Sequence, residues 1–287
     1  MQKTTYSQSL LITLVCYVFS FSIAYFITSL INISHIWINI LCWHLLSTFF
    51  VFMFSSFYKN SSLYDPFWSV APVPIVIYLC LLNNNDLLIN LFLIFPIVFW
   101  SIRLTINWLI SWPGLHHEDF RYVDLKNNIP IKSFINNFFG IHFIPTLIVN
   151  IALYPSYYLF MNIEELNFLF FIAFVFTISA VIIQLVADKQ MRSFRTNPNN
   201  NGLTMKYGLW KYSRHPNYLG EILFWFGLFS MSITTSNDQY WTIIGPFLML
   251  MLFIFISCPL MDERSLKKRS DFDDYMKKTS QLFFWIN

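Results

Sequence analysis

The chain has 287 residues, of which 56% are hydrophobic and only 11% are charged, and its formal net charge is +3. Soluble proteins carry about 25% charged residues, so this composition excludes an ordinary soluble domain and indicates a helical protein that crosses a membrane several times. The small net charge gives no indication of a nucleic-acid partner. The seven glycines form neither a G-x-G-x-x-G nor a P-loop pattern, which excludes a Rossmann turn and a Walker phosphate loop.

Eight apolar runs follow one another along the chain, and each is about 16 to 23 residues long, close to the length that crosses a bilayer core. In chain order they are 9–31, 36–57, 66–82, 87–108, 142–160, 166–186, 219–234 and 240–260. The run at 219–234 is short enough to be tilted, shallow or half-inserted. The sequence therefore predicts an all-α polytopic transmembrane bundle of about seven or eight spans.

Positive charge is distributed unevenly among the connections between these runs. The connections after the first, third, fifth and seventh runs contain no Lys or Arg, whereas all 18 Lys and Arg lie in the tails, in the other connections or near the matching end of a run. By the positive-inside rule, both termini and the loops 109–141 and 187–218 are predicted to be cytoplasmic. We expect a multi-pass integral membrane protein, in the endoplasmic reticulum if the source is eukaryotic.

The cysteines and histidines indicate no metal site. The four cysteines lie within apolar runs and show no C-x-x-C spacing, so we interpret them as buried hydrophobic residues. The six histidines form no H-x-x-x-H or H-E-x-x-H pattern. A G-x-S-x-G nucleophile motif is also absent from the sequence, which argues against a serine hydrolase.

A first polar cluster is predicted at the end of the fourth apolar run. Arg103 and Asn107 are spaced i, i+4, so on a helix they present one polar face. The alternative is an arginine that extends from the bilayer core to its interface without binding a ligand.

A second polar cluster extends the sixth run, where Gln184, Asp188, Arg192 and Arg195 have spacings of four, four and three residues. These spacings place the four side chains on one stripe of a helix. Guanidinium groups bind phosphate in a bidentate manner, and a carboxylate accepts hydrogen bonds from ribose hydroxyls. The alternative is a helix end held by salt bridges.

A third polar cluster is the string of nine residues 213–221, which lies at the start of an apolar run. Pro216 suits the first turn of a helix, whose free N–H groups attract anions. Asn217 and Glu221 then lie four residues apart on one helical face. A single histidine is usually structural, but His215 beside this helix start is also a candidate ligand-binding residue.

The last polar group follows the final apolar run. Residues 258–264 are predicted to interrupt this run and to expose charged side chains beyond it, and Tyr275 follows in the tail. The basic residues 267–269 predict either contact with anionic lipid or an ordinary solvated tail.

The string and its surroundings closely resemble the signature of the DUF1295 family, whose members are related to the C-terminal domain of steroid 5-alpha-reductases. The matching residues are Gly208-Leu209-Trp210, Tyr212-Ser213-Arg214-His215-Pro216-Asn217-Tyr218, Gly220-Glu221, Asp65-Pro66-Phe67-Trp68-Ser69, Arg103, Asn107, Asp188-Lys189-Gln190, Phe194 and 259–264. The resemblance covers about residues 60–280. It divides the chain into an N-terminal transmembrane hairpin, 1–60, and a reductase-like membrane domain, 61–287.

This resemblance implies an NADPH-dependent reduction of a carbon–carbon double bond conjugated to a ketone, in a lipid or steroid-like substrate. It also implies that the nucleotide lies between helices and under cytoplasmic loops. Together with the polar stripes, it predicts a set of cofactor-binding residues. They are Arg103, Asn107, Asp188, Arg192, Arg195, Arg214, His215, Asn217, Tyr218, Glu221, Arg264 and Tyr275.

In the implied reaction, hydride goes to the beta carbon of the enone and an acid stabilises the developing enolate. A glutamate and a tyrosine have this role in the steroid reductases. The region that matches the glutamate holds Asp65, and Trp100 occupies the position aligned with the tyrosine. Tryptophan cannot protonate an oxygen in the same way, so the predicted catalytic residues are Asp65, Tyr64 and Tyr122.

Two other functions remain open at this stage. Isoprenylcysteine and phospholipid methyltransferases carry a similar Arg-His-Pro-x-Tyr motif and bind S-adenosylmethionine, but a paired glutamate is expected where this chain has Asp262-Glu263. The two arginines of the stripe 184–195 favour NADPH, because S-adenosylmethionine has no phosphate. A transporter or other non-enzymatic membrane protein is the third reading, although the strong charges gather at one predicted surface and no two halves match.

Overall fold

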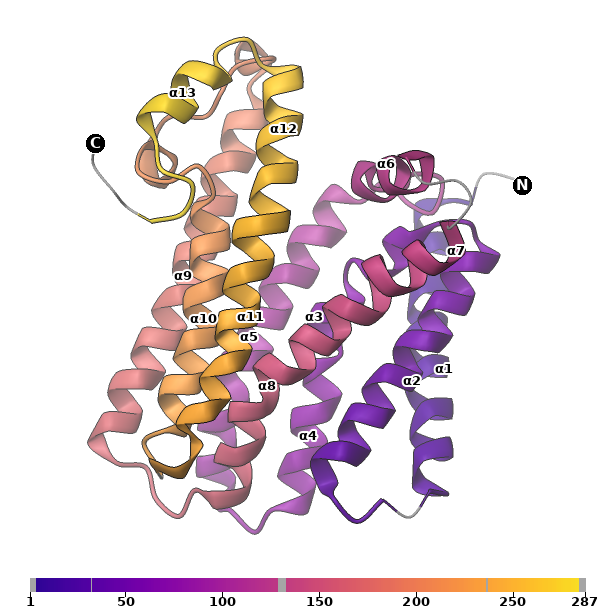
Figure 1. Cartoon of the computed structure of the whole chain (residues 1–287), viewed down its shortest axis with the longest axis vertical. Helices are drawn as coiled ribbons and strands as arrows, with labels where there is room; N and C mark the ends of the chain where they lie inside the picture. Colours follow the sequence, from indigo (N-terminus) through magenta and orange to yellow (C-terminus); the bar gives the residue numbers. More distant parts are fainter. Residues whose placement is uncertain (1–3, 32, 129–132, 236, 284–287) are drawn as a thin grey trace. The chain divides into compact units, whose positions relative to one another are not determined.

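The computed structural model describes residues 4–31, 33–128, 133–235 and 237–283 (Figure 1). Within these ranges the chain is helical and contains no strand, which confirms the predicted all-α polytopic bundle. Two compact units form along the chain, unit 1 at 1–161 and unit 2 at 162–287. Each unit is described by itself. The division predicted at residues 60 and 61 follows the family resemblance and stays a prediction.

Seven helical stretches in the described part of the chain are long and apolar enough to cross a membrane. They are Tyr6–Ser29, Ile36–Phe57, Ser61–Leu82, Leu87–Ser111, Phe134–Asn162, Phe168–Thr196 and Gln239–Lys268. The short run at 219–234 forms α10, Pro216–Ser232, whose 17 residues fall below this length. At 1.5 Å per residue α10 extends about 26 Å, slightly less than a bilayer core. The predicted orientation of the termini stays a prediction.

Unit 1 begins with two long helices, α1 (Tyr6–Ser29) and α2 (Ile36–Phe57), which pack against each other. Thr5 and Gln8 form a capping box at the start of α1, which satisfies N–H groups that have no partner inside the helix. The remaining elements are η1 (Ser61–Tyr64), α3 (Phe67–Val70), α4 (Pro72–Leu82), α5 (Leu87–Ser111), α6 (Phe120–Asn128), α7 (Ser133–Asn136), the π-helical turn η3 (Asn137–Phe143) and α8 (Ile144–Asn162).

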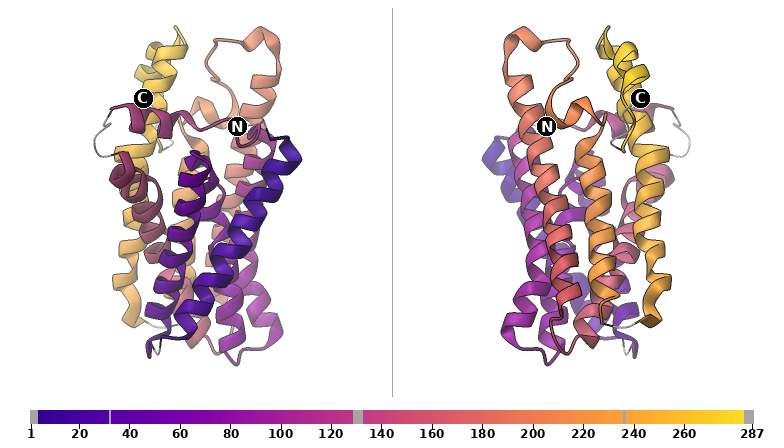
Figure 2. Two further views of the ribbon diagram at one scale, coloured as in Figure 1. Left: turned by 90° about the vertical axis from the view of Figure 1, so that its right-hand side faces the viewer. Right: turned by 90° about the vertical axis from the view of Figure 1, so that its left-hand side faces the viewer.

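Unit 2 is built around α10, of whose 17 residues 12 are buried. In Figure 1 and in the right-hand view of Figure 2, α10 runs beside α9 (Phe168–Thr196) and beside α11 (Ile244–Leu252). The other elements are η4 (Pro198–Asn200), η5 (Gly208–Lys211), η6 (Asn237–Ile243), the π-helical turn η7 (Phe253–Ser257), α12 (Cys258–Lys268) and α13 (Phe272–Lys278).

The interruption predicted at 258–264 is wrong in one respect. The helix does not break there, because α11 passes through the π-helical turn η7 directly into α12, which continues to Lys268. Pro259 lies in the first turn of α12, where a residue without an N–H group removes no helical hydrogen bond. The chain turns only after Lys268, and α13 follows.

Two glycines of α10 let this helix approach α9 closely. A Cβ atom at Gly220 would lie 2.8 Å from the backbone oxygen of Ala180, and one at Gly227 would lie 3.0 Å from the Cα of Thr177. Real Cβ atoms do not approach backbone atoms that closely without a shift of one helix. Small residues at helix contacts are typical of membrane proteins, in which packing rather than hydrophobicity drives association.

The first prediction tests this close approach with Gly227→Val. The new side chain would collide with Thr177, so we expect a loss of about 1–3 kcal/mol in stability, measured as a lower midpoint of thermal unfolding in detergent. Ser230→Val is the matched control, since it adds the same side chain to the same helix at a half-buried position. Equal midpoints for the two variants would contradict the close contact.

Candidate functional site

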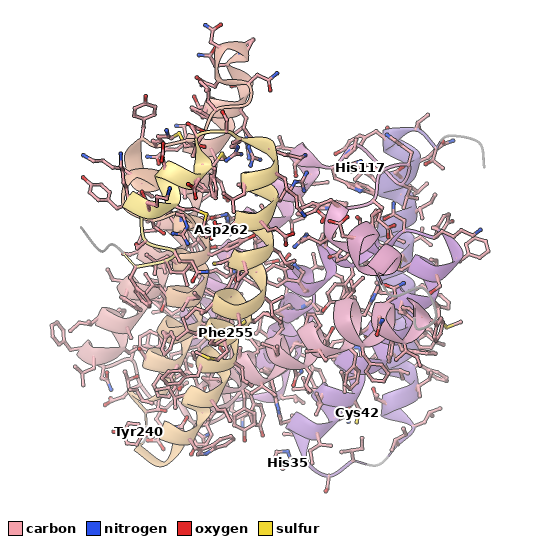
Figure 3. The ribbon with its side chains drawn as sticks, turned by 45° about the horizontal axis from the view of Figure 1, so that its top comes forward. His35, Cys42, His117, Tyr240, Phe255 and Asp262 are labelled. Carbon is pink, nitrogen blue, oxygen red and sulfur yellow. The ribbon has the colours of Figure 1, made fainter. Side chains whose placement is uncertain are left out.

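The carboxylate of Asp262 on α12 is the centre of a buried polar group in unit 2. Arg214 Nη2 donates to Asp262 Oδ2 at 3.0 Å, and His215 Nε2 donates to Asp262 Oδ1 at 2.9 Å. All three side chains are at most 12% exposed. Figure 3 shows polar side chains gathered around Asp262. Each oxygen of this carboxylate is therefore bound by one of two consecutive residues of the string 213–221, Arg214 and His215.

Arg214 also holds the C-terminal tail of unit 2. Its Nη1 donates to the backbone oxygen of Thr279 at 2.7 Å and to that of Met276 at 3.3 Å. Its backbone N–H donates to Ser280 O at 2.9 Å. Tyr275 OH donates back to the carbonyl oxygens of Trp210 and Ser213. Arg214 and Tyr275 thus fasten the tail to the loop before α10, and their predicted contact with a cofactor stays a prediction.

Along α10 the predicted residues differ in their surroundings. Glu221 is 3% exposed, and its Oε1 accepts a hydrogen bond from Trp225 Nε1 at 3.0 Å. Asn217 is half-buried one turn earlier. Tyr218 stacks on His215, with ring centroids 5.4 Å apart and an interplanar angle of 13°. A buried carboxylate next to a helix start is an uncommon feature, and it makes Glu221 the strongest candidate on this helix for contact with a ligand.

The loop before α10 is anchored on α9. Trp210 Nε1 donates to Ala187 O at 3.1 Å, and Leu209 N donates to Gln190 Oε1 at 3.0 Å. Gly208 has φ +59° and lies against the Gln190 side chain, a conformation and a close approach that favour glycine. Residues 208–210 therefore attach this loop to α9, through Ala187 and Gln190.

Three arginines come together near the end of α9. The charge of Arg195 is repelled by Arg269 and Arg264 and attracted by Asp188. Burial lowers the pKa of Arg269, the nearby Asp271 and Tyr275 raise it, and Arg264 lowers it further. We call Arg195, Arg264 and Arg269 the arginine cluster. Three like charges repel one another, and this arrangement favours the binding of an anion.

Two residues of unit 2 were not predicted from the sequence in these positions. Asp262 was not expected to bind Arg214 and His215, and Arg269 was interpreted as part of a basic tail. Asp262 lies far along the chain from Arg214, and Arg269 lies far from Arg195, so helical spacing could not reveal these contacts. The basic run 267–269 was the available signal for Arg269.

A second polar group lies in unit 1 around Asp65. Tyr122 OH donates to Asp65 Oδ1, and Arg121 Nη2 lies 3.3 Å from the same oxygen. Arg121 Nε also donates to Asp119 Oδ1 at 2.7 Å. Burial raises the pKa of Tyr122 well above its ordinary value, and the negative charge of Asp65 raises it further. Tyr122 therefore keeps its proton at neutral pH and offers it to Asp65.

The segment that carries Asp65 is held by the loop that carries Tyr122. Asn60 caps η1, and its Nδ2 donates to the backbone oxygens of Leu115 and His117 at 2.8 and 3.0 Å. Ser61 N donates to Glu118 Oε1 at 2.6 Å. Figure 3 labels His117 on this loop. These contacts join two segments about fifty residues apart and place Tyr122 beside Asp65.

The other predicted residues of unit 1 lie apart from this pair. Tyr64 is buried, and its OH forms a hydrogen bond with Thr146 Oγ1 at 2.7 Å rather than with Asp65. Trp100 is fully buried and packs edge-on against Trp68, with centroids 5.6 Å apart. Arg103 is buried in α5, and Asn107 is half-buried one turn later. Trp100 is thus a packing residue, and the phenol that reaches Asp65 is Tyr122.

The comparisons with known proteins place the chain in a family. The model of the family described as protein of unknown function (DUF1295) matches residues 51–279. The chain belongs to the DUF1295 family. A curated relative, an uncharacterized protein of Schizosaccharomyces pombe, is 24% identical over 255 residues, which cover 78% of this chain and 73% of the relative. No solved structure matches the chain significantly.

The DUF1295 match contains every predicted site residue of both units. It includes Asp65 and Tyr122 as well as the arginine cluster, and it begins inside α2, whereas residue 61 was the predicted start of this domain. The match extends as far as Thr279, whose backbone oxygen Arg214 binds. The tail that Arg214 and Tyr275 fasten is therefore part of the family domain rather than an appendage.

The second prediction concerns Asp262→Asn. This change leaves the buried Arg214 without its counter-charge, so we expect a loss of about 3–5 kcal/mol in stability. The tail beyond Arg269 should also become susceptible to limited proteolysis, since Arg214 holds it.

Glu263→Gln is the matched control for Asp262→Asn, because it removes the neighbouring carboxylate. Glu263 is exposed and pairs with Lys267 on the surface, and such pairs contribute at most about 1 kcal/mol. Equal unfolding midpoints and equal proteolysis for the two variants would show that Asp262 does not hold Arg214 and the tail.

Proposed function

We propose that the protein is a membrane-embedded, NADPH-dependent reductase of a carbon–carbon double bond conjugated to a carbonyl group in a lipid or steroid-like substrate. The observation that carries this proposal is the arginine cluster of unit 2. Membership of DUF1295 agrees with the proposal, because the same residues resemble the steroid 5-alpha-reductases.

The arginine cluster fits the phosphate groups of a nucleotide. Within the described part of the chain, the side chains of Arg195 and Arg269 form no hydrogen bond or ion pair, so their donors are not used by the protein. Guanidinium groups bind phosphate oxygens through two parallel hydrogen bonds. Asp188, which attracts Arg195, suits ribose hydroxyls as an acceptor. This donor set matches a phosphorylated dinucleotide better than S-adenosylmethionine, which is a cation with no phosphate.

The proposal assigns nucleotide binding to unit 2. Arg195, Arg264 and Arg269 would bind the phosphate groups, and Asp188 the ribose. Glu221 and Asn217 offer an acceptor and an amide on the face of α10. When bound, NADPH supplies the hydride for the reduction.

The proposal assigns the acid to unit 1. Tyr122 holds a proton at its OH because burial and the charge of Asp65 raise its pKa. As negative charge develops on the substrate's carbonyl oxygen, Tyr122 donates a hydrogen bond and then the proton to this oxygen. Arg121 lies beside Asp65 and Tyr122 and stabilises the negative charge that the proton leaves behind. Tyr64 has a lesser role in the proposal, because its OH bonds Thr146 and does not reach Asp65.

The third prediction tests nucleotide binding with Arg195→Ala and Arg269→Ala. Each change removes a charge-assisted hydrogen bond, which contributes about 1.5–3 kcal/mol, so NADPH affinity should fall about tenfold to a hundredfold. Purified protein in detergent is titrated with NADPH, NADH and S-adenosylmethionine by isothermal calorimetry. Lys277→Ala is the control, because it removes an equal charge from an exposed pair with Asp273.

Each result of this titration has a distinct meaning. Tight binding of S-adenosylmethionine without binding of NADPH would overturn the reductase and favour the methyltransferase. Binding of none of the three ligands would favour a non-enzymatic membrane protein. Unchanged NADPH affinity in both arginine variants would remove the cluster from the site.

The fourth prediction tests the acid with Tyr122→Phe and Asp65→Asn. Loss of a general acid lowers turnover by about 10² to 10⁴, whereas NADPH affinity should not change. Turnover is measured as NADPH oxidation with a steroid that carries a conjugated enone. Tyr6→Phe is the control, since it removes an exposed phenol hydroxyl from the same unit. A larger loss in Tyr64→Phe than in Tyr122→Phe would show that Tyr64 is the acid.

A further inference from the structure

The carboxylate of Asp271, in the turn between α12 and α13, is bound by the loop 201–207, which connects η4 to η5. Lys206 Nζ donates to Asp271 Oδ2 at 2.7 Å, and Thr204 Oγ1 donates to Asp271 Oδ1 at 2.5 Å. The backbone N–H of Thr204 also donates to Oδ2, at 3.4 Å. Three donors from one loop therefore meet at a single carboxylate that lies 67 positions further along the chain than Thr204.

The bonds from this loop keep Asp271 in its charged form. Burial on its own would raise the pKa of Asp271, but the bonds from Lys206 and Thr204 outweigh burial and lower this pKa below its ordinary value. The side chains of Lys206 and Asp271 are 43% and 29% exposed, so the pair lies at the surface of unit 2. Asp271 is thus a charged, ion-paired carboxylate at neutral pH.

Arg269 is the cation nearest to Asp271 in the sequence, yet the two side chains form no ion pair. They lie two residues apart, and the charge of Asp271 attracts Arg269. Among the described residues, none forms a hydrogen bond or an ion pair with the Arg269 side chain, whereas both oxygens of Asp271 are bound by Thr204 and Lys206. The loop 201–207 therefore occupies the carboxylate in place of Arg269, whose guanidinium group stays in the arginine cluster.

A carboxylate released in this turn would compete with any anionic ligand for Arg269. An ion pair within the protein would neutralise one of the three charges of the arginine cluster and would use donors that a phosphate group needs. The loop 201–207 also follows closely after Arg195, because α9 ends at Thr196. Its attachment to Asp271 therefore connects the segments that carry Arg195 and Arg269.

We propose that Thr204 and Lys206 are positioning residues of a phosphate-binding site, because they hold Asp271 away from Arg269 and so leave the arginine cluster available to a phosphate group. The inference rests on the proposed function only for the source of the phosphate, which is NADPH in that proposal. The cluster itself requires only a phosphate group, since guanidinium groups bind the phosphate oxygens. Inorganic pyrophosphate is therefore a second probe, independent of the nucleotide.

The fifth prediction compares Lys206→Met with the double variant that also carries Asp271→Asn. In Lys206→Met, Asp271 loses its cation and pairs with Arg269, so the affinities for pyrophosphate and NADPH should fall about threefold to fivefold, as expected for competition by a partly exposed ion pair. Asp271→Asn removes the competing charge and should restore both affinities at least to those of the unaltered protein. The full chain is titrated with each ligand in detergent by isothermal calorimetry.

The double variant separates competition for Arg269 from loss of the loop attachment. It also lacks the ion pair between Lys206 and Asp271, so a purely structural role of this pair would leave it as weak as Lys206→Met. Lys206→Arg keeps the cation and should bind both ligands as the unaltered protein does. Lys211→Met is the matched control, because it removes an equal charge from an exposed side chain that lies over the ring of Tyr212, and the affinities should not change.

The outcomes distinguish this inference from the proposed function. Equal affinities of the unaltered protein and Lys206→Met, or a double variant as weak as Lys206→Met, would overturn the inference and leave NADPH binding intact. The expected pattern with pyrophosphate but no binding of NADPH would support the inference and overturn the nucleotide. If the unaltered protein binds neither ligand, both proposals fail.

Discussion

The buried charge of Asp262 is the interaction on which the organisation of unit 2 depends. A carboxylate that is 5% exposed is stable only with counter-charges and hydrogen bonds, and consecutive residues, Arg214 and His215, supply both. Because Arg214 also binds the tail after α13, one ion pair joins α12, the start of α10 and the C-terminal segment. The loop before α10 and one member of the arginine cluster, Arg264 on α12, lie on elements that this interaction connects. Arg214 and His215, which belong to the motif of the family, therefore have a structural role: they hold these segments of unit 2 together.

Much of the fold could be predicted because hydrocarbon imposes a simple rule on sequence. Each apolar run corresponds to a helix, since only helices satisfy every backbone group within one segment. The short run at 219–234 was correctly recognised as unusual, and it became α10, the most buried helix of unit 2. The π-helical turn η7 could not be predicted, because its residues 253–257 are as apolar as their neighbours and carry no glycine or proline. A break was expected at 258–264, but the helix continues through this segment.

The candidate site was predicted to the extent that helical spacing determines it. The i, i+4 spacing correctly placed the side chains of Asn217 and Glu221 on successive turns of α10. Helical spacing cannot predict contacts between segments that are far apart in the sequence. Asp65 meets Tyr122 only because the cap at Asn60 holds the loop 115–119, and Arg214 meets Asp262 across two helices. The resemblance supplied the candidates, but the partner of each side chain came from the tertiary structure.

The polar residues of this protein are of two kinds: those whose polar atoms bond to other protein groups, and those with polar atoms that do not. Tyr275 and the Thr48–Thr146 pair are buried, and their hydroxyl groups bond to protein groups, so their burial is explained by structure alone. Arg195 and Arg269 on one unit, and His44 with Asn150 on the other, keep donors or acceptors that no described residue uses. The unsatisfied atoms of the buried His44–Asn150 pair are costly in the protein, whereas the exposed Arg195 and the half-buried Arg269 are open to water and to an anion. In a chain with so few charges, the polar atoms left unsatisfied are better guides to function than the motif itself.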